Sequence, residues 1–349
     1  MDFKNKLINW YSIHKREFPW RGTKNPYYIW LSEIILQQTQ VKQGLPYYES
    51  FVKTFPTVFD LANASEESVL KLWQGLGYYS RARNLHTSAK HVANELNGVF
   101  PNNYTDLLKL KGVGDYTASA IASISFNEVA AVVDGNVYRV LARYFGIDTP
   151  INSTNGIKEF KKLASSLIDK EQPATYNQAI MEFGARQCKP KNPDCTVCPL
   201  KDNCVSLGKN LISTLPVKLK KTKVSTKYFN FLVCIDKEKN VLFEKRLGKG
   251  IWQNLYQFPL VESEKSLSAN EFHFLNIEAI ISKTIDFDYS LYNDVDKVHK
   301  LSHQHLHTKF WIIEVEDSLE KGISNKDLIK YPAPVLISDF IDKFNFEAL

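Results

Sequence analysis

The sequence predicts two domains of different class: an all-α domain over residues 1–215 and a smaller α+β domain over residues 228–349. Three observations predict this division. Apolar residues recur at helical spacing through the first 215 residues, and short turns separate the periodic segments. A lysine-rich stretch without acidic residues follows at 216–227. Beyond it, segments rich in β-branched and aromatic residues replace the helical pattern.

In residues 1–215, segments with apolar residues at helical spacing follow one another along the chain. The apolar run at 130–133 is too brief to assign. Helices are predicted at 29–41, 65–72, 80–96, 116–125, 136–145, 157–167 and 176–186.

The second half reads as strands at 228–236, 241–246 and 301–315, followed by an amphipathic helix at 334–344. The stretch at 216–227 is predicted to be a basic linker, which is either a solvated tether or a segment that also contacts phosphates.

Composition and charge suit a globular protein with a polyanionic partner. Hydrophobic residues make up 44% of the 349 residues, charged residues make up 23%, and the formal net charge is +6. We find no secretory signal and no apolar stretch long enough to cross a bilayer, so we expect a cytoplasmic protein without membrane contact.

Four of the five cysteines crowd into seventeen residues with the spacing Cys-x6-Cys-x2-Cys-x5-Cys, at Cys188, Cys195, Cys198 and Cys204. Zinc sites usually use two Cys-x2-Cys pairs or include histidine, whereas only one such pair is present here. A [4Fe–4S] cluster is therefore favoured over zinc. The cluster is expected to close the end of the helical domain, and the lysines of its loop can also face a phosphate backbone.

The sequence Leu-Lys-Gly-Val-Gly at 110–114 lies between two helical segments. Gly112 and Gly114 permit a tight turn that leaves backbone N–H groups exposed at the start of the next helix, where they can bind a phosphate without reading bases. Together with the Thr-Ala that begins the following helix, this is the helix–hairpin–helix pattern.

Two acids stand at unusual positions. Glu33 shares a helix face with apolar residues, so burial is expected to favour its protonated form, unless an arginine simply neutralises it. Asp134 precedes a helix, where it is either an ordinary N-cap or a carboxylate that the helix N-terminus keeps ionised. Glycoside cleavage requires two acids in opposite protonation states, one protonated and one ionised.

These segments resemble the MutY-type adenine DNA glycosylases in order and spacing. The resemblance runs through the first 205 residues and includes Pro-Trp-Arg at 19–21, the segment 32–41, the segment 75–83, the hairpin, Val-Asp-Gly-Asn-Val at 133–137 and the four-cysteine loop. The tail resembles that family's Nudix-like domain. The resemblance implies a monomeric base-excision repair enzyme that flips out and releases adenine mispaired with 8-oxoguanine or guanine in double-stranded DNA.

Residue roles follow from the same resemblance. Glu33 matches the general acid that protonates adenine N7, and Asp134 matches the carboxylate that stabilises the oxocarbenium-like sugar. Tyr116 and Asn136 match residues that support this charge centre. The adenine pocket is expected to include Trp20, Arg21 and Gln178, and the side chains that wedge into the duplex are expected to be Gln38, Leu76 and Tyr78.

Tyr116 distinguishes the reaction class. Sibling enzymes that also nick the strand resemble this chain but carry a lysine just after the hairpin, where it forms a Schiff base. A phenol cannot form that adduct, so hydrolysis alone is predicted. The alternatives are a bifunctional pyrimidine-lesion glycosylase with lyase action and a non-catalytic iron–sulfur DNA-binding protein. Retention of both Glu33 and Asp134 argues against the second alternative.

In the second domain, Leu301-Ser302-His303 resembles the loop that reads 8-oxoguanine, whose usual form is Phe-Ser-His. Ser302 can accept a hydrogen bond from the N7–H that guanine lacks, and His303 can contact the lesion or its phosphate. Leu301 departs from the usual phenylalanine and weakens stacking. Asp115 places a negative charge beside the hairpin, where it is expected to weaken phosphate binding. The segment 248–264 lacks the glutamate-rich helix of a Nudix pyrophosphatase.

Overall fold

The structure is a computed structural model that describes residues 3–219, 224–275, 277, 280–281 and 286–348. It divides into two compact units, residues 1–63 with 84–220 and residues 64–83 with 221–349. The short segment 64–83 thus belongs with the C-terminal residues, which the boundaries expected from the sequence do not anticipate. Three lysines of the expected linker, at 220, 221 and 223, lie outside the described residues.

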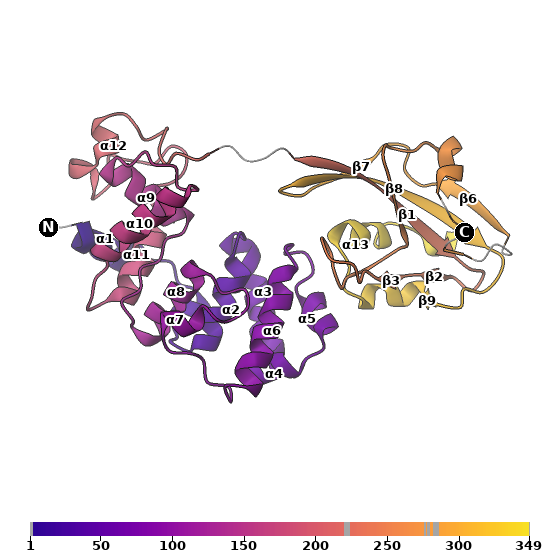
Figure 1. Cartoon of the computed structure of the whole chain (residues 1–349), viewed down its shortest axis with the longest axis horizontal. Helices are drawn as coiled ribbons and strands as arrows, with labels where there is room; N and C mark the ends of the chain where they lie inside the picture. The colour runs from indigo at the N-terminus through magenta and orange to yellow at the C-terminus, as the bar shows by residue number, and fades with distance from the viewer. Residues whose placement is uncertain (1–2, 220–223, 276, 278–279, 282–285, 349) are drawn as a thin grey trace. The chain divides into compact units, whose positions relative to one another are not determined.

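The first unit is helical throughout (Figure 1). The helix expected at 65–72 lies in the second unit, and the unit boundary falls within α6 (Ser80–Asn94). The helices of the first unit are α1 (Phe3–His14), α2 (Pro26–Leu36), α3 (Val41–Thr54), α4 (Val58–Asn63), most of α6, α7 (Tyr104–Leu107), α8 (Asp115–Phe126), α9 (Gly135–Phe145), α10 (Thr154–Leu167), α11 (Pro173–Arg186) and α12 (Val205–Gly208), with 3₁₀ turns η1 (Pro19–Arg21) and η2 (Lys201–Asn203).

The helix expected at 29–41 is too long. Asn25 caps α2 by accepting a 2.9 Å hydrogen bond from the Tyr27 N–H, and the helix ends at Leu36. Gln38 then adopts a left-handed backbone with φ of 54°, which a continuous α-helix does not permit. The chain turns at this point and resumes as α3.

Helix α8 is the centre of the first unit and packs against α2, α7 and α11. Eight consecutive residues from Thr117 to Ile124 are buried, and most of them are alanine or serine. Small side chains allow neighbouring helices to approach closely. A similar approach occurs at Gly184 of α11, where an added Cβ would lie 2.7 Å from the Cβ of Asn136. The glycine therefore lets the first turn of α9 pack directly on α11.

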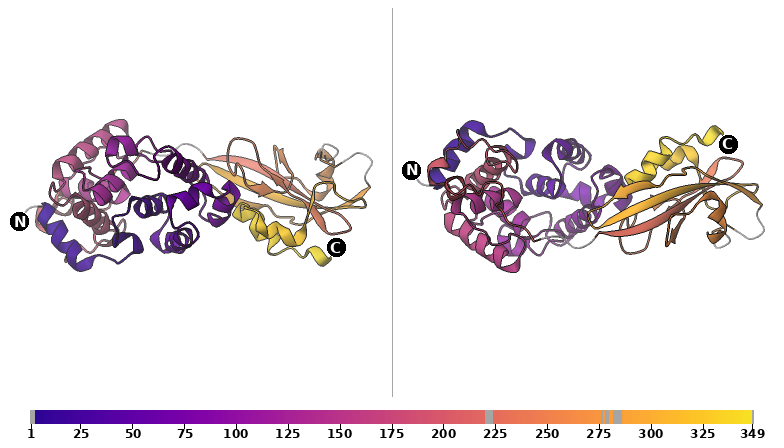
Figure 2. Two further views of the ribbon diagram at one scale, coloured as in Figure 1. Left: turned by 90° about the horizontal axis from the view of Figure 1, so that it is seen from below. Right: turned by 90° about the horizontal axis from the view of Figure 1, so that it is seen from above.

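The second unit contains a seven-stranded mixed sheet with the order β6-β8-β1-β2-β9, in which β5 also pairs with β1 and β7 with β8 (Figures 1 and 2). The long strands β1 and β8 run parallel at its centre. The unit also contains α5 (Glu66–Leu72), η3 (Ala269–Phe274), η5 (Asn325–Lys330), α13 (Val335–Ile341) and η6 (Phe346–Ala348). The strands are β1 (Ser225–Ile235), β2 (Asn240–Leu242), β3 (Glu244–Lys245), β4 (Tyr256–Gln257), β5 (Leu260–Ser263), β6 (Phe287–Leu291), β7 (Lys297–Lys300), β8 (Gln304–Val315) and β9 (Gly322–Ser324), with β3 and β4 forming a separate pair.

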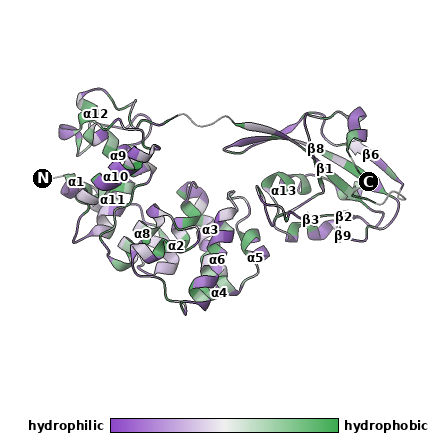
Figure 3. Ribbon diagram, in the orientation of Figure 1, coloured by the Kyte–Doolittle hydropathy of each residue, from purple (hydrophilic) through white to green (hydrophobic). Residues whose placement is uncertain are grey.

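Both faces of the central strands are covered. On one face Phe310 stacks on Phe340 of α13 at 4.3 Å between ring centroids. On the other face Trp311 lies 5.3 Å from Phe272 of η3. Because both faces are buried there, the second halves of β1 and β8 are apolar runs, at 231–235 and 310–313. Figure 3 colours the strands by the hydropathy of each residue. The expected α+β class is confirmed.

Side chains tie the segment 64–83 to the rest of this unit. Glu67 of α5 accepts hydrogen bonds from Lys245 Nζ at 3.0 Å and from the Tyr256 hydroxyl at 2.9 Å. Gln74 donates to Ser338 Oγ at 2.6 Å. These bonds explain why the segment clusters with the sheet. Among the residues that the structure describes, no helix has the length and apolarity to span a bilayer.

Candidate active site

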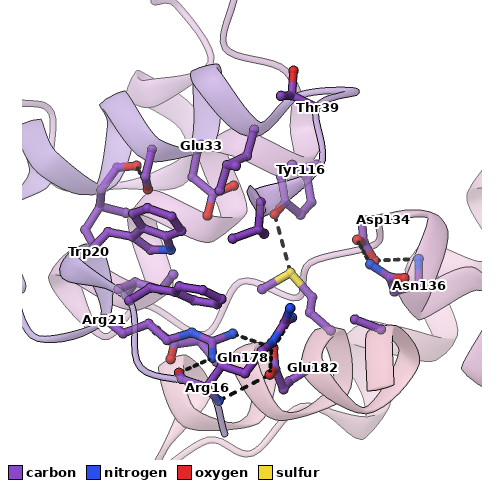
Figure 4. A pocket seen from close by; sticks show the side chains of 18 residues that line it. Arg16, Trp20, Arg21, Glu33, Thr39, Tyr116, Asp134, Asn136, Gln178 and Glu182 are labelled. Atoms are coloured by element: carbon purple, nitrogen blue, oxygen red, sulfur yellow. Dashed lines mark hydrogen bonds and ion pairs between the residues drawn. The ribbon is translucent and has the colours of Figure 1, made fainter. Parts of the chain in front are cut away.

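A cavity of about 210 Å³ opens in the first unit between η1, α2, α8, the start of α9 and α11 (Figure 4). Its volume is nearer to that of a single base than to the roughly 300–1,000 Å³ of pockets for drug-sized ligands. Most of the residues expected to act on adenine line this one cavity, namely Trp20, Arg21, Glu33, Tyr116, Asp134, Asn136 and Gln178. Gln38 does not line it.

Glu33 lies on the buried face of α2 and is only 9% exposed. Burial raises its pKa to about 7, while contact with the Tyr116 hydroxyl opposes the shift and the charge of Asp134 adds to it. The side chain therefore holds its proton up to near-neutral pH. A carboxylic acid of this kind can protonate a leaving group at physiological pH.

Asp134 is the N-cap of α9. Its carboxylate accepts hydrogen bonds from the backbone N–H groups of Asn136 at 2.9 Å and Val137 at 2.8 Å, and from the Asn136 side-chain amide at 2.7 Å. These bonds and Arg139 favour the ionised form as expected. Burial nevertheless outweighs them and raises the pKa of Asp134 above its ordinary value. Fewer neighbouring groups favour the ionised form of Glu33 than that of Asp134.

Tyr116, in the first turn of α8, lines the same cavity and donates a 3.4 Å hydrogen bond to Met181 Sδ. Burial, followed by the charges of Glu33 and Asp134, raises its pKa well above the ordinary value. The phenol therefore stays protonated and can donate a hydrogen bond to a carboxylate. Its position beside Glu33 agrees with a supporting role rather than a nucleophilic one.

An ion-pair network that the sequence analysis missed forms another wall. Glu182 of α11 is 1% exposed and accepts from Arg16 Nε at 2.6 Å and from Arg21 at 2.8 Å. Burial would raise its pKa, but the two guanidinium groups outweigh burial and lower the pKa to about 2. Because Gln178 was already expected in the pocket, its helical spacing of four residues to Glu182 was a signal for this acid.

Aromatic rings frame the rest of the cavity. Trp20 is buried and stacks on Phe18 with 5.0 Å between centroids and an interplanar angle of 15°. Gln178 accepts a 2.6 Å hydrogen bond from the Tyr11 hydroxyl, which fixes the orientation of its amide. The cavity thus has flat apolar surfaces together with an oriented amide, a combination suited to a planar heterocyclic base.

The hairpin forms between α7 and α8 as expected. Gly112 has φ of +79°, and an added Cβ would lie 2.8 Å from Asn84 Cβ. Gly114 is the N-cap of α8, and the space around it is open. The Asp115 carboxylate, expected to disturb phosphate binding, forms an ion pair with Lys161 Nζ at 2.8 Å. One positive charge therefore lies beside Asp115.

The four clustered cysteines are all free and partly buried in the loop that follows α11. Burial and the neighbouring thiols raise the pKa of Cys195, and burial raises that of Cys198 to about 11, so the thiols lie within electrostatic reach of one another. Among the described residues, no three His, Cys, Asp or Glu side chains converge closely enough to hold one metal ion.

Ser302 and His303, expected to read the opposite strand, and two of the side chains expected to wedge into the duplex, Leu76 and Tyr78, lie in the second unit. A cavity of about 600 Å³ is lined by the loop 75–80 and by residues 299–304, including Leu76, Tyr78, Ser302 and His303. Tyr78 has a left-handed backbone with φ of 47° and is 47% exposed, whereas Leu76 is only 7% exposed. The Ser302 hydroxyl lies 3.4 Å from His303 Nδ1. Gln38 lies in the first unit.

Comparison with known proteins agrees with this geometry. Residues 31–166 match the model of the HhH-GPD superfamily of base excision DNA repair proteins, and residues 230–343 match a NUDIX domain. Adenine DNA glycosylase of Buchnera aphidicola subsp. Baizongia pistaciae is 36% identical over 98% of this chain and 97% of its own. The human adenine DNA glycosylase is 44% identical over 58% of this chain and 39% of its own.

Solved structures resemble the helical unit. A thermostable thymine-DNA glycosylase has a TM-score of 0.56 and 31% identity, covering 59% of this chain and 95% of that one. A trapped endonuclease III–DNA covalent intermediate has a TM-score of 0.52 and 23% identity, covering 60% of this chain and 95% of that one. At this identity the similarity shows only that the two chains share a fold.

The helical unit, its hairpin and its acid-lined cavity define a base excision DNA repair protein of the helix–hairpin–helix superfamily. Because similarity to a curated relative extends over almost the whole of both sequences, the chain belongs to the MutY-type adenine DNA glycosylases, which are hydrolases acting on N-glycosyl bonds.

Proposed function

We propose that this enzyme hydrolyses the N-glycosidic bond of adenine paired with 8-oxoguanine, or with guanine, in double-stranded DNA. The observation that carries the proposal is the convergence of Glu33, Asp134 and Tyr116 on one base-sized cavity. A base inside a duplex cannot reach such a cavity, so the adenine nucleotide must leave the stack first.

In the proposed mechanism, Glu33 donates its proton to adenine N7, and the glycosidic bond then breaks with a neutral purine as the leaving group. A pKa of about 7 supports this role, because roughly half of the acid is protonated near neutral pH and is still strong enough to donate. After bond cleavage the Glu33 carboxylate can accept a proton from the attacking water.

Asp134 is proposed to stabilise the positive charge that develops on the sugar. Its ionised form is supported by hydrogen bonds from Asn136 and by Arg139, although burial opposes ionisation. A positively charged sugar placed against the carboxylate would favour ionisation further. Tyr116 and Asn136 are proposed as positioning residues for these two acids. Asn136 donates a hydrogen bond to Asp134, and the Tyr116 hydroxyl, which donates to Met181 Sδ, lies close enough to Glu33 to oppose the rise of its pKa.

Adenine recognition is assigned to Trp20, Arg21 and Gln178. The stacked ring of Trp20 offers an apolar surface, and the ion pair with Glu182 holds Arg21 at the wall. We further propose that Gln38, Leu76 and Tyr78 fill the gap beside the flipped base, with the exposed Tyr78 ring most available to stack. Gly112 and Gly114 are proposed to bind the backbone phosphate.

The cysteine loop is proposed to hold a [4Fe–4S] cluster through Cys188, Cys195, Cys198 and Cys204. Two arginines of α9 support this loop: Arg139 donates to the Cys188 carbonyl at 2.7 Å, and Arg143 donates to Cys188 Sγ at 3.5 Å. The cluster would link the end of the helical domain to the helix that Asp134 caps. No reaction step is assigned to it.

Ser302 and His303 are proposed to read the oxidised edge of the base opposite adenine. Both line a cavity that also includes the stacking candidate Tyr78. We retain 1–215 and 228–349 as the catalytic and recognition domains, with 216–227 as the linker, and propose a monomer. Binding to one mispaired duplex needs no second copy of either site.

The deciding experiment offers duplexes with adenine opposite 8-oxoguanine, and with thymine glycol opposite adenine, and follows base release before and after alkali. The expected result is adenine release that becomes a strand break only after alkali. Glu33→Gln should remove the activity. Release of thymine glycol with direct strand cleavage would instead support a bifunctional glycosylase, and absence of release from both duplexes would contradict the proposal.

A further inference from the structure

The cavity of about 600 Å³ in the second unit contains a polar side chain that neither the sequence motifs nor the comparisons assign. Gln304 is the first residue of β8 and lines this cavity directly after His303. Its Oε1 atom is buried and has no hydrogen-bond partner among the described residues. A buried acceptor without a donor is unfavourable, which suggests that a ligand supplies the donor.

The backbone around Gln304 holds the side chain in place. Its carbonyl accepts a 2.8 Å hydrogen bond from the Leu301 N–H, which closes a tight turn, and the Ser225 N–H binds the His303 carbonyl at 3.1 Å. Alternation along β8 places Gln304 on the same face as the fully buried Leu306. His299 of β7 pairs with Leu306 of β8, and His299 also lines the cavity.

Flat aromatic groups form other walls of this cavity. Trp252 is buried and lines it, with the His299 ring 5.8 Å away. Tyr78 lines it from the loop 75–80. Aromatic walls around one buried amide suit a planar base that is stacked and read along one edge. Trp252 lines the same cavity as Leu301, which replaces the usual phenylalanine.

The two edges of guanine and 8-oxoguanine differ in a way that a glutamine amide can detect. An amide offers one acceptor and one donor group side by side. Unmodified guanine presents two acceptors, N7 and O6, on its major-groove edge. In 8-oxoguanine N7 carries a hydrogen, so the same edge presents one donor beside one acceptor and matches the amide.

We propose that Gln304 is a specificity-determining residue, which accepts a hydrogen bond from N7–H and donates one to O6 of the 8-oxoguanine opposite adenine. This inference rests on the proposed lesion-reading function of the second unit. A serine hydroxyl both donates and accepts, so Ser302, two residues before Gln304, would donate to the C8 carbonyl of the lesion instead of accepting from N7–H. The two residues would then read the whole oxidised edge.

The test compares single-turnover rates of adenine release opposite 8-oxoguanine and opposite guanine. Gln304→Met keeps the length of the side chain and removes its amide. We expect the ratio of the two rates to fall about tenfold, because a good bidentate contact discriminates between bases on this scale. The rate opposite guanine should change little, since guanine cannot satisfy the amide.

Gln257→Met is the matched control. Gln257 in β4 also has a buried Oε1 without a partner among the described residues, but it does not line the cavity. This control should keep the wild-type ratio. A second comparison uses 7-deaza-8-oxoguanine, in which C–H replaces N7–H: the substitution should slow the wild type and leave Gln304→Met nearly unaffected.

Three results would overturn this inference alone: a wild-type rate ratio in Gln304→Met, an equal loss of rate opposite both bases in Gln304→Met, or an equal effect of Gln257→Met. A fourth result, a wild-type enzyme without preference for 8-oxoguanine, would overturn the proposed lesion reading as well, so the two failures are distinguishable.

Discussion

Arg21 of η1 and Glu182 of α11 form an ion pair at 2.8 Å in the wall of the candidate active site. The two residues are 161 positions apart in the sequence. Arg16 shares the same carboxylate, so one nearly inaccessible acid joins the N-terminal segment to the last long helix of the first unit. The network therefore contributes to stability and to the shape of the cavity.

Glu182→Gln should destabilise the protein. The substitution removes the carboxylate that Arg16 and Arg21 share and leaves two guanidinium groups near a neutral amide. Loss of one partner from a buried ion pair typically costs about 3–5 kcal/mol, and the partial exposure of Arg16 places our expectation near the lower end. Urea unfolding measures it, and Glu17→Gln, which changes an exposed side chain, is the control. A change below about 1 kcal/mol would contradict the role of the network.

Adenine release should decline as the pH rises through about 7. The reason is that the pKa of Glu33 is raised to about 7, and only its protonated form can donate to N7. Single-turnover kinetics at saturating enzyme between pH 5.5 and 9 would follow the decline. A rate that rises steadily over this range would rule out Glu33 as the proton donor.

Glu33→Gln should make the protein more stable at alkaline pH. The folded-state pKa of about 7 exceeds the ordinary value of 4.5, so ionisation favours the unfolded chain as the pH rises between these values. Glutamine removes this penalty, and the gain at pH 8 relative to pH 4 should reach about 3 kcal/mol at most. Denaturant unfolding at the two pH values would check this. A difference between variant and wild type that is independent of pH would contradict burial as the cause.

The wild-type enzyme should form no adduct that borohydride can trap on mispaired DNA, because Tyr116 has no amine. Tyr116→Lys places an amine in the cavity between Glu33 and Asp134 and should raise trapping from background to a readily detected fraction of the enzyme. Denaturing gels of the reduced mixture give the measurement. Tyr116→Phe should stay at background, and efficient trapping by the wild type would overturn the hydrolytic assignment.

Cys198→Ser should lower the iron content from about four atoms per chain and weaken the helical unit, because one ligand of the proposed cluster is lost. Cys234→Ala should retain full iron, since Cys234 is the one cysteine outside the loop and lies buried in β1. Iron analysis of folded, gel-filtered protein compares the two variants. One zinc per chain and no iron in the wild type would contradict the proposed cluster.

The sequence was sufficient for the two fold classes and for most of the central elements. Helices α8, α9 and α11 follow from apolar spacing, because one face of each is buried against neighbours. Elements whose sequence pattern is weak were not expected. Helices α1 and α3 were missed. The short strands β5, β6, β7 and β9 were missed as well, because pairing with β1, β2 and β8 rather than local pattern defines them.

What the sequence alone determined is the chemical inventory: an acid on an apolar helix face, an acid at a helix start, a hairpin and a cysteine cluster. Only the tertiary structure decided which groups share an environment. Burial raises the pKa of Asp134 despite its N-cap hydrogen bonds. The tertiary fold also pairs Glu182 with two arginines that are distant in the sequence. Desolvation and long-range ion pairing depend on residues that are close in space and remote in sequence, so no local pattern can specify them.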